Sequence, residues 1–201
     1  MKKYIVLVLL ISMIMPGFTQ QAGNKFDKED LLKYFEQTYQ QISETVAGLN
    51  SKQLHFKPSD NQWSVSQCLY HIVLTEGELM EYVYEAMKQP EKPYLRDSIK
   101  ISDNDIRGFV TDRSFKASAQ NDLKNTVTYN TVEEALAKLL ASRKKIKEYI
   151  NSLPEESFRN HIVQWPSGYF DSLQTLLFIA GHSERHLLQI KEVIADKNFP
   201  Q

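Results

Sequence analysis

Apolar residues recur at intervals of three and four along four stretches of the chain, the spacing that gathers side chains on one face of an α-helix. Each stretch begins at a residue whose side chain can accept a hydrogen bond from a free backbone amide: Asp27, Ser64, Thr131, and Asp171 or Ser172. The stretches end near Gly48, Pro90, Pro154 and Ile194. Four amphipathic helices of about 20 residues each are the content of a four-helix bundle. The sequence therefore predicts an all-α fold.

Two of the connections between these helices are more than plain loops. A long, polar connection from Pro90 to Asn130 joins the second helix to the third, and it includes a predicted short helix from Ser102 to about Gly108. Such a length indicates a bundle with a crossover. Between the third and fourth helices, "FRNHIVQWPSGYF" alternates polar and apolar residues around a Pro-Ser-Gly turn, which predicts a small hairpin.

The first 20 residues, "MKKYIVLVLLISMIMPGFTQ", have the layout of a secretory signal peptide. Two lysines precede an uncharged apolar run, which a Pro-Gly pair ends at Pro16. A membrane anchor is the alternative, but a span needs about 20 apolar residues and this run is shorter. We expect a signal peptide over residues 1–19 and a single mature domain over 20–201. The mature protein is then exported to a bacterial periplasm or beyond, without stable membrane insertion.

Charge and cysteine content narrow the function further. The 24 Lys and Arg residues nearly balance the 25 Asp and Glu residues and are scattered, which argues against nucleic acid as a partner. Cys68 is the single cysteine, so no intramolecular disulfide can form. A lone thiol in an apolar helix is typical of core packing. Stability must therefore come from the core or from a bound metal.

Histidines supply the candidate chemistry. His182 and His186 are four residues apart in the fourth helix, where both imidazoles can point at one position. Two ligands alone are a weak signal, but His71 lies on or beside the inward stripe of the second helix. Three imidazoles from two facing helices form a tridentate site with open coordination positions, as in catalytic zinc sites. His55 and His161 have no helical partner and are interpreted as loop residues.

The alternative is that His71 is a buried histidine with a hydrogen-bonding neighbour and that the other two are surface-polar. The residues around the three histidines are apolar or small, and uncompensated imidazoles there would be costly, which favours a metal. Imidazole suits zinc, nickel, copper or iron, and we expect a divalent ion, zinc or nickel before the others.

No general base is evident from the sequence. Glu76, Glu78 and Glu184 are near the histidines along the chain, and Glu78 shares the face of His71 best; carboxylates on an exposed helix surface are the alternative for each. Gln189 follows His186 and could orient a ligand. Among the aromatic residues, Trp63 is interpreted as a structural staple at a helix start, whereas Trp165 and Tyr169 would line a pocket if the hairpin covered the metal.

Two segments carry a resemblance to a known family, "LHFKPSDNQWSVSQCLYHIVLTE" and "GHSERHLLQI". The first has a Lys-Pro turn, a Trp-Ser helix start at Trp63 and a histidine seven residues after that serine; the second has a histidine pair followed by a glutamine. The chain resembles the DinB-like proteins, four-helix bundles that include the YfiT-type thiol transferases and share a three-histidine metal site. Carried over by position, the family's ligands fall on His71, His182 and His186. The resemblance also implies a homodimer.

Three functions are compatible with the sequence. The first is a metal-dependent hydrolase or thiol transferase acting on an unknown small-molecule substrate, in which the metal activates water or a thiol. The second is a non-catalytic bundle that binds a metal or small ligand, and the third is a partner-binding protein without metal. Relatives that act on low-molecular-weight thiols work inside the cell, so the predicted export weakens the thiol-transferase interpretation.

Overall fold

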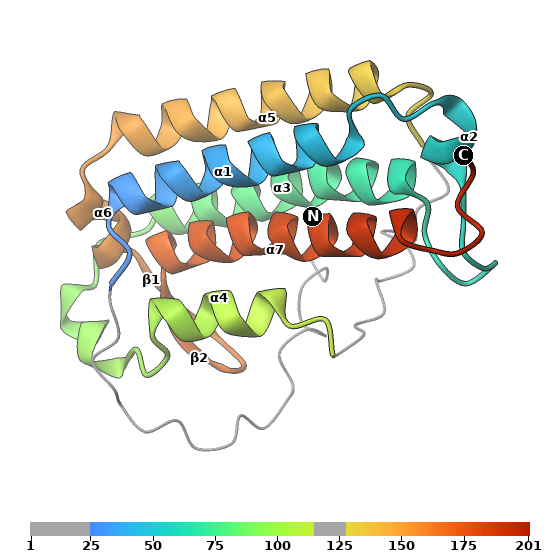
Figure 1. The fold of residues 1–201 in the computed structure, drawn as a ribbon. Helices are drawn as coiled ribbons and strands as arrows, with labels where there is room; N and C mark the ends of the chain where they lie inside the picture. The colour runs from blue at the N-terminus through green and yellow to red at the C-terminus, as the bar shows by residue number, and fades with distance from the viewer. Residues whose placement is uncertain (1–24, 115–127) are drawn as a thin grey trace, which may run out of the picture.

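The computed structural model describes residues 25–114 and 128–201, so the predicted signal peptide lies outside the described residues. Four long helices form the body of the protein (Figure 1). Their bounds are α1 Lys28–Val46, α3 Val65–Met87, α5 Val132–Ser152 and α7 Ser172–Ile194. These are the four helices that the hydrophobic spacing predicts.

Local hydrogen bonds explain where each long helix begins. The side chains of Asp27, Ser64, Thr131 and Asp171 each accept a bond from the backbone amide three residues later. At Ser64 and Asp171 the bond is reciprocal, because a glutamine side chain accepts from the capping residue's own amide. The predicted helix starts are therefore confirmed, with Asp171 rather than Ser172 as the last cap.

The long helices pack as two layers of parallel neighbours. In Figure 1, α1 and α7 run in one direction and α3 and α5 in the other. α7 packs on both α3 and α1, and α5 packs on the same two helices. The α3 and α7 pair is thus antiparallel, which places the first half of α3 beside the second half of α7.

Short elements occupy the connections. They are α2 (Ser51–His55), a 3₁₀ helix η2 (Pro93–Ser98), α4 (Asp103–Thr111), α6 (Glu155–Asn160) and the antiparallel strands β1 (Ile162–Trp165) and β2 (Gly168–Asp171). The hairpin is confirmed, and α4 begins after Ser102 as predicted but continues past Gly108. The sequence patterns missed α2, η2 and α6. His55, interpreted as a loop residue, ends α2, and His161 follows α6.

α4 lies along the outside of α7 and completes its burial (Figure 1). They are in tight contact at Gly181, where an added Cβ would overlap the side chain of Val110. Arg113, just beyond α4, makes a paired contact with Glu192 of α7, with nitrogen–oxygen distances of 3.1 and 2.7 Å. α4 is therefore fixed against the part of α7 that carries His182.

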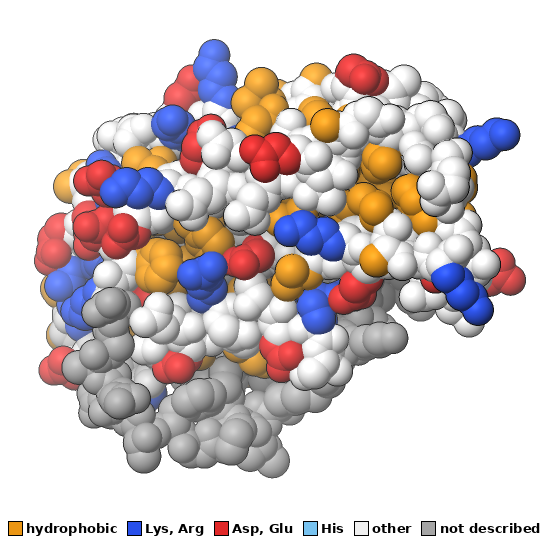
Figure 2. Space-filling model, in the orientation of Figure 1, with side chains coloured by type: hydrophobic (Ala, Val, Ile, Leu, Met, Phe, Trp, Pro, Cys, Tyr) orange, Lys and Arg blue, Asp and Glu red, His pale blue; other side chains and the backbone are white. Residues whose placement is uncertain are grey.

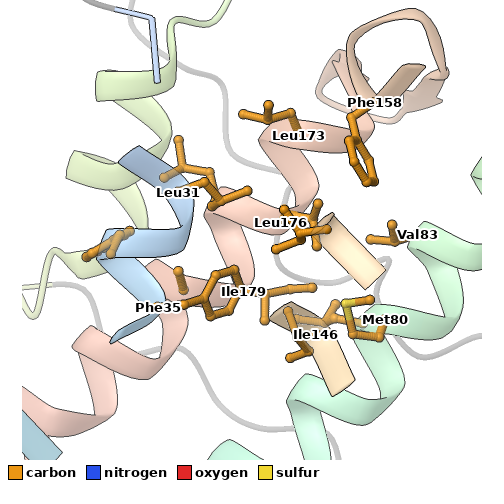
Figure 3. Packing of buried hydrophobic residues seen from close by; sticks show 14 of the residues in the cluster. Leu31, Phe35, Met80, Val83, Ile146, Phe158, Leu173, Leu176 and Ile179 are labelled. Carbon is orange, nitrogen blue, oxygen red and sulfur yellow. The ribbon is translucent and has the colours of Figure 1, made fainter. Parts of the chain in front are cut away.

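The core consists of two apolar clusters with a polar layer between them. One cluster lies toward the hairpin and includes the residues labelled in Figure 3; the other includes Cys68 and lies toward α2. On each long helix a buried polar residue falls between the members of the two clusters: Thr38, Glu76, Arg143 and Ser183. Cys68 is fully buried among apolar neighbours, as predicted.

The surface carries charges of both signs. Figure 2 shows Lys and Arg side chains interspersed with Asp and Glu over one face, in keeping with a net charge of −1. No helix in residues 25–114 or 128–201 combines the length and the hydropathy required to cross a membrane.

Candidate metal centre

His71, His182 and His186 meet in the interface between α3 and α7. Each offers a ring nitrogen, and these atoms all lie within 4.8 Å of one another. The three side chains are buried, with exposed fractions of 5%, 9% and 7%. The antiparallel packing of α3 on α7 therefore brings together the three residues that the sequence predicts as a group.

The spacing of the ring nitrogens fits a metal ion. Nε2 of His182 and Nε2 of His186 are 3.2 Å apart. Two nitrogens at about 2.0–2.1 Å from one tetrahedral ion are separated by roughly 3.3 Å. The ring of His71 lies across this pair, with its centroid 5.2 Å from that of His182 and 4.6 Å from that of His186. The His182 and His186 nitrogens thus have the separation of two ligands of one ion, and a nitrogen of His71 lies within 4.8 Å of them.

A hydrogen bond to Gln189 sets the tautomer of His186. Nδ1 of His186 lies 2.9 Å from Oε1 of Gln189, and because an amide oxygen can only accept, Nδ1 carries the hydrogen. Nε2 is then left with its lone pair directed at the other two histidines. Such a partner is typical of metal-ligating histidines, whose second ring nitrogen donates to an oxygen. Gln189 thus has the ligand-orienting position that the sequence suggests.

Burial keeps the three imidazoles in their neutral form. It lowers the pKa of His71 to about 4. Burial also lowers the pKa of His182 and of His186 well below 6.5, and the neighbouring histidines lower both further. All three rings are therefore neutral at pH 7, each with one N–H and one nitrogen lone pair. Because metal binding requires the neutral ring, no proton has to be displaced at this pH.

Aromatic side chains enclose the histidines. The ring of Trp63 stacks on His186 at 5.8 Å between centroids and meets His71 edge-on at 4.8 Å. Phe178 stacks on His182 at 6.4 Å. Trp63 is thus both part of a helix start and a wall of the site, which the interpretation as a staple did not include. Phe178 was missed, although its position four residues before His182 puts it on the same face of α7.

The three candidate carboxylates do not join the histidines. Within the described residues, this histidine cluster is the only group of three or more His, Cys, Asp or Glu side chains close enough together to hold one metal ion. Glu184 is held on the other side of α7, where it accepts from the hydroxyl of Tyr34 and from Arg107 at 3.4 Å. Glu78 lines a surface depression formed by Tyr70 and other residues of α3 together with Tyr129, which precedes α5. Neither belongs to the group of side chains with metal-ligand spacing.

Glu76 differs most from the expectation of an exposed carboxylate. Its exposed fraction is 1%, and its Oε1 lies 2.7 Å from a guanidinium nitrogen of Arg143. The side chain faces the core rather than solvent, so the alternative of an exposed surface carboxylate is wrong for Glu76. The reason is that α5 supplies a buried cation opposite it, which no pattern within α3 reveals.

The hairpin lies away from the histidines. Trp165 packs against Tyr82 of α3, with 5.7 Å between ring centroids. Tyr82 is eleven residues beyond His71, or roughly 16 Å along the helix. Trp165 therefore does not form a wall of this site, and the aromatic enclosure comes from Trp63 and Phe178 instead.

Comparisons with known proteins agree with this architecture. YuaE of Bacillus subtilis (strain 168), an uncharacterized protein, is 26% identical over 152 residues, which are 74% of this chain and 87% of YuaE. YfiT from Bacillus subtilis, described as a probable metal-dependent hydrolase with an unusual four-helix bundle topology, matches with a TM-score of 0.60 at 14% identity. That match covers 91% of this chain and 95% of YfiT and shows a shared fold, which confirms the predicted bundle type. The family model of the DinB superfamily matches residues 34–190, most of the chain, and the protein therefore belongs to the DinB superfamily.

Proposed function

We propose that this protein binds one divalent metal ion through His71, His182 and His186 and acts as a metal-dependent hydrolase or transferase on a small molecule. The observation that carries the proposal is the cluster of three buried, neutral imidazoles whose ring nitrogens lie within 4.8 Å of one another. The description of YfiT, a protein of the same fold, as a probable metal-dependent hydrolase supports the same reading.

Three protein ligands leave coordination positions for water or substrate. A bound divalent ion of this kind can lower the pKa of water to about 7 and polarise a carbonyl or phosphoryl oxygen. The residues of the chain contribute the rest: Gln189 holds the ring of His186, and Trp63 and Phe178 exclude bulk water from two sides. The all-nitrogen donor set favours zinc or nickel over magnesium or calcium, which prefer oxygen ligands.

We further propose that the protein works outside the cytoplasm, because residues 1–19 have the composition of a signal peptide. Hydrolysis needs only water as its second reactant, whereas transfer to a low-molecular-weight thiol needs a reduced thiol pool. Export therefore favours hydrolysis over thiol transfer. A homodimer is proposed from the family resemblance, and size-exclusion chromatography with light scattering on residues 20–201 tests it.

Metal content is the first test. The mature protein is purified without an affinity tag, loaded with zinc or nickel, desalted and analysed by inductively coupled plasma mass spectrometry. We expect about one ion per wild-type chain and a large loss in His71→Ala. His55→Ala is the matched control, because His55 is an exposed histidine on α2 outside the cluster. Fewer than about 0.2 ions per wild-type chain would refute the metal site.

Catalysis is tested separately from binding. Metal-loaded wild-type protein and His71→Ala are assayed against panels of esters, thioesters, amides and thiol conjugates. Turnover that requires the metal and is lost in His71→Ala supports the enzyme. A stoichiometric metal without turnover on any panel would instead support the non-catalytic metal- or ligand-binding bundle.

A further inference from the structure

A hydrogen-bonded network crosses the bundle at the level of the polar layer. The carboxylate of Glu76 on α3 accepts from Ser183 of α7 at 2.9 Å and from Ser142 of α5 at 2.9 Å, and it pairs with Arg143 of α5 at 2.7 Å. Another nitrogen of Arg143 donates to Thr38 of α1 at 3.1 Å. The network therefore joins all four long helices, and Glu76 is the residue through which α3 joins it.

The hydrogen bonds of this network depend on direction, whereas the apolar contacts between the helices do not. Apolar clusters on both sides of it can slide by a fraction of a turn and keep most of their buried area, whereas hydrogen bonds weaken steeply outside a narrow range of distance and angle. Buried polar groups of this kind are best attested as devices that fix the register of packed helices. Glu76 and Ser183 therefore set how far α3 is shifted along α7.

The same two helices carry all three histidines. Ser183 directly follows His182, and Glu76 is five residues beyond His71, or roughly 8 Å along α3. A metal site requires its ligand distances to hold within about 0.2 Å. A small slip of α3 against α7 would move His71 relative to His182 and His186 by more than this tolerance. The contact between Glu76 and Ser183 is close to the histidines on each helix, so a slip at this contact would move the histidines by the same amount.

We propose that Glu76 is a positioning residue for the metal centre: by accepting the Ser183 hydroxyl and pairing with Arg143, it holds His71 at coordinating distance from His182 and His186. This inference rests on the proposed metal site. It differs from a stabilising role, because a buried ion pair can often be replaced by apolar side chains without loss of stability. Stability and ligand geometry can therefore be separated by experiment.

The separating variant is Glu76→Leu combined with Arg143→Met, which removes both charges together. Ser183 keeps a partner in this variant, since its hydroxyl also donates to the carbonyl of Ile179 at 3.3 Å. Thr38 likewise keeps its bonds to main-chain carbonyls of α1 at 3.0 Å. Ser142 loses its bond to Glu76, but its side chain is only partly buried and can turn to solvent. The fully buried hydroxyls keep partners, so the double variant is expected to fold. Ser183→Ala is a second, smaller change that removes only the α7 contact to Glu76.

A second buried ion pair in the same bundle provides the matched control. Arg159 of α6 pairs with Asp103 at 2.7 Å and with Asp171 at 2.9 Å, and its exposed side-chain fraction is 11%. Asp171 is eleven residues before His182, roughly 16 Å along α7. Arg159→Met should therefore lower stability without moving the histidines.

Cobalt(II) is the probe, because its visible absorption reports ligand geometry as well as occupancy. Each protein is titrated with Co²⁺, and its melting temperature is recorded. We expect about tenfold weaker Co²⁺ binding in the double variant, which is the lower end of the range for residues that support metal ligands. Its absorption spectrum should change whether or not its melting temperature differs from that of wild type. Ser183→Ala should also weaken Co²⁺ binding and change the absorption spectrum, but by less than the double variant. Arg159→Met should melt earlier but keep the wild-type dissociation constant and spectrum.

Three results would overturn the inference. Wild-type affinity and spectrum in both the double variant and Ser183→Ala would show that the register contact does not position the ligands. An equal loss of affinity in Arg159→Met would show that affinity follows stability alone. Wild-type protein that binds no Co²⁺ would remove the proposed metal site itself and this inference with it, an outcome that the wild-type titration identifies before any variant is compared.

Discussion

Replacing His71 by Gln should make the folding of the metal-free protein less sensitive to acid. The folded protein holds His71 with a pKa of about 4, below the value of 6.5 for an exposed imidazole, because the ring is buried. Between these two values the unfolded chain binds a proton at this position and the folded chain does not. Stability therefore falls as the pH drops from about 6.5 toward 4, and it no longer changes through this group below that range.

The size of the effect follows from the two pKa values. A difference of one pKa unit corresponds to about 1.36 kcal/mol, so the full loss from His71 is about 3 kcal/mol once the pH is well below 4. At pH 5 the expected part is about 2 kcal/mol, because the unfolded chain is almost fully protonated there and the folded chain is not. His182 and His186 add to the acid sensitivity, but both remain in the variant.

Urea unfolding measures the effect directly. Wild type and His71→Gln are unfolded at about pH 7.5 and about pH 5 in the presence of a chelator, and the free energies of unfolding are compared. The loss on acidification should be about 2 kcal/mol smaller in His71→Gln. His55→Gln, at an exposed histidine, should lose as much as wild type. Equal losses in His71→Gln and wild type would refute the assignment of a buried, neutral imidazole at this position.

Three further predictions concern the surroundings of the site. Gln189→Ala should weaken zinc binding by about 10–100-fold in calorimetric titrations, because His186 loses its tautomer-fixing acceptor, whereas Gln189→Glu should retain tight binding. Gly181→Ala should cost about 1–3 kcal/mol in chemical unfolding, since its Cβ overlaps Val110, and Val110→Ala in the same chain should restore part of that loss. Ser64→Ala should cost about 1 kcal/mol in the same assay by leaving a first-turn amide of α3 uncapped.

Helix positions, helix starts and the inward faces could be predicted because each depends on residues close together in the chain. The cap at Ser64 uses a glutamine three residues away, and the pair His182 and His186 shares a face through helical periodicity alone. The choice of His71 as a third ligand also came from periodicity, which put it on the inner side of its helix. The structure places these residues as the patterns predict.

The short elements could not be predicted in the same way. α2 and α6 have too few residues for a hydrophobic period to show, and each packs on a long helix that is distant in sequence or follows later in the chain. Among single residues, the burial of Glu76 is the feature that the sequence patterns predicted least well. Its neighbours in sequence do not reveal that Arg143, from another helix, neutralises it in the core.

The sequence alone determined that four amphipathic helices form, that His182 and His186 share one helical face, and that His71 lies on or beside the inward stripe of its helix, because helical period and capping act over three or four residues. Only the tertiary structure decided that α3 and α7 are antiparallel neighbours, that Trp63 and Phe178 enclose the histidines, and that Glu184 faces away. These features depend on which helix faces meet and at what register. That choice is made by the packing of distant segments around a shared core.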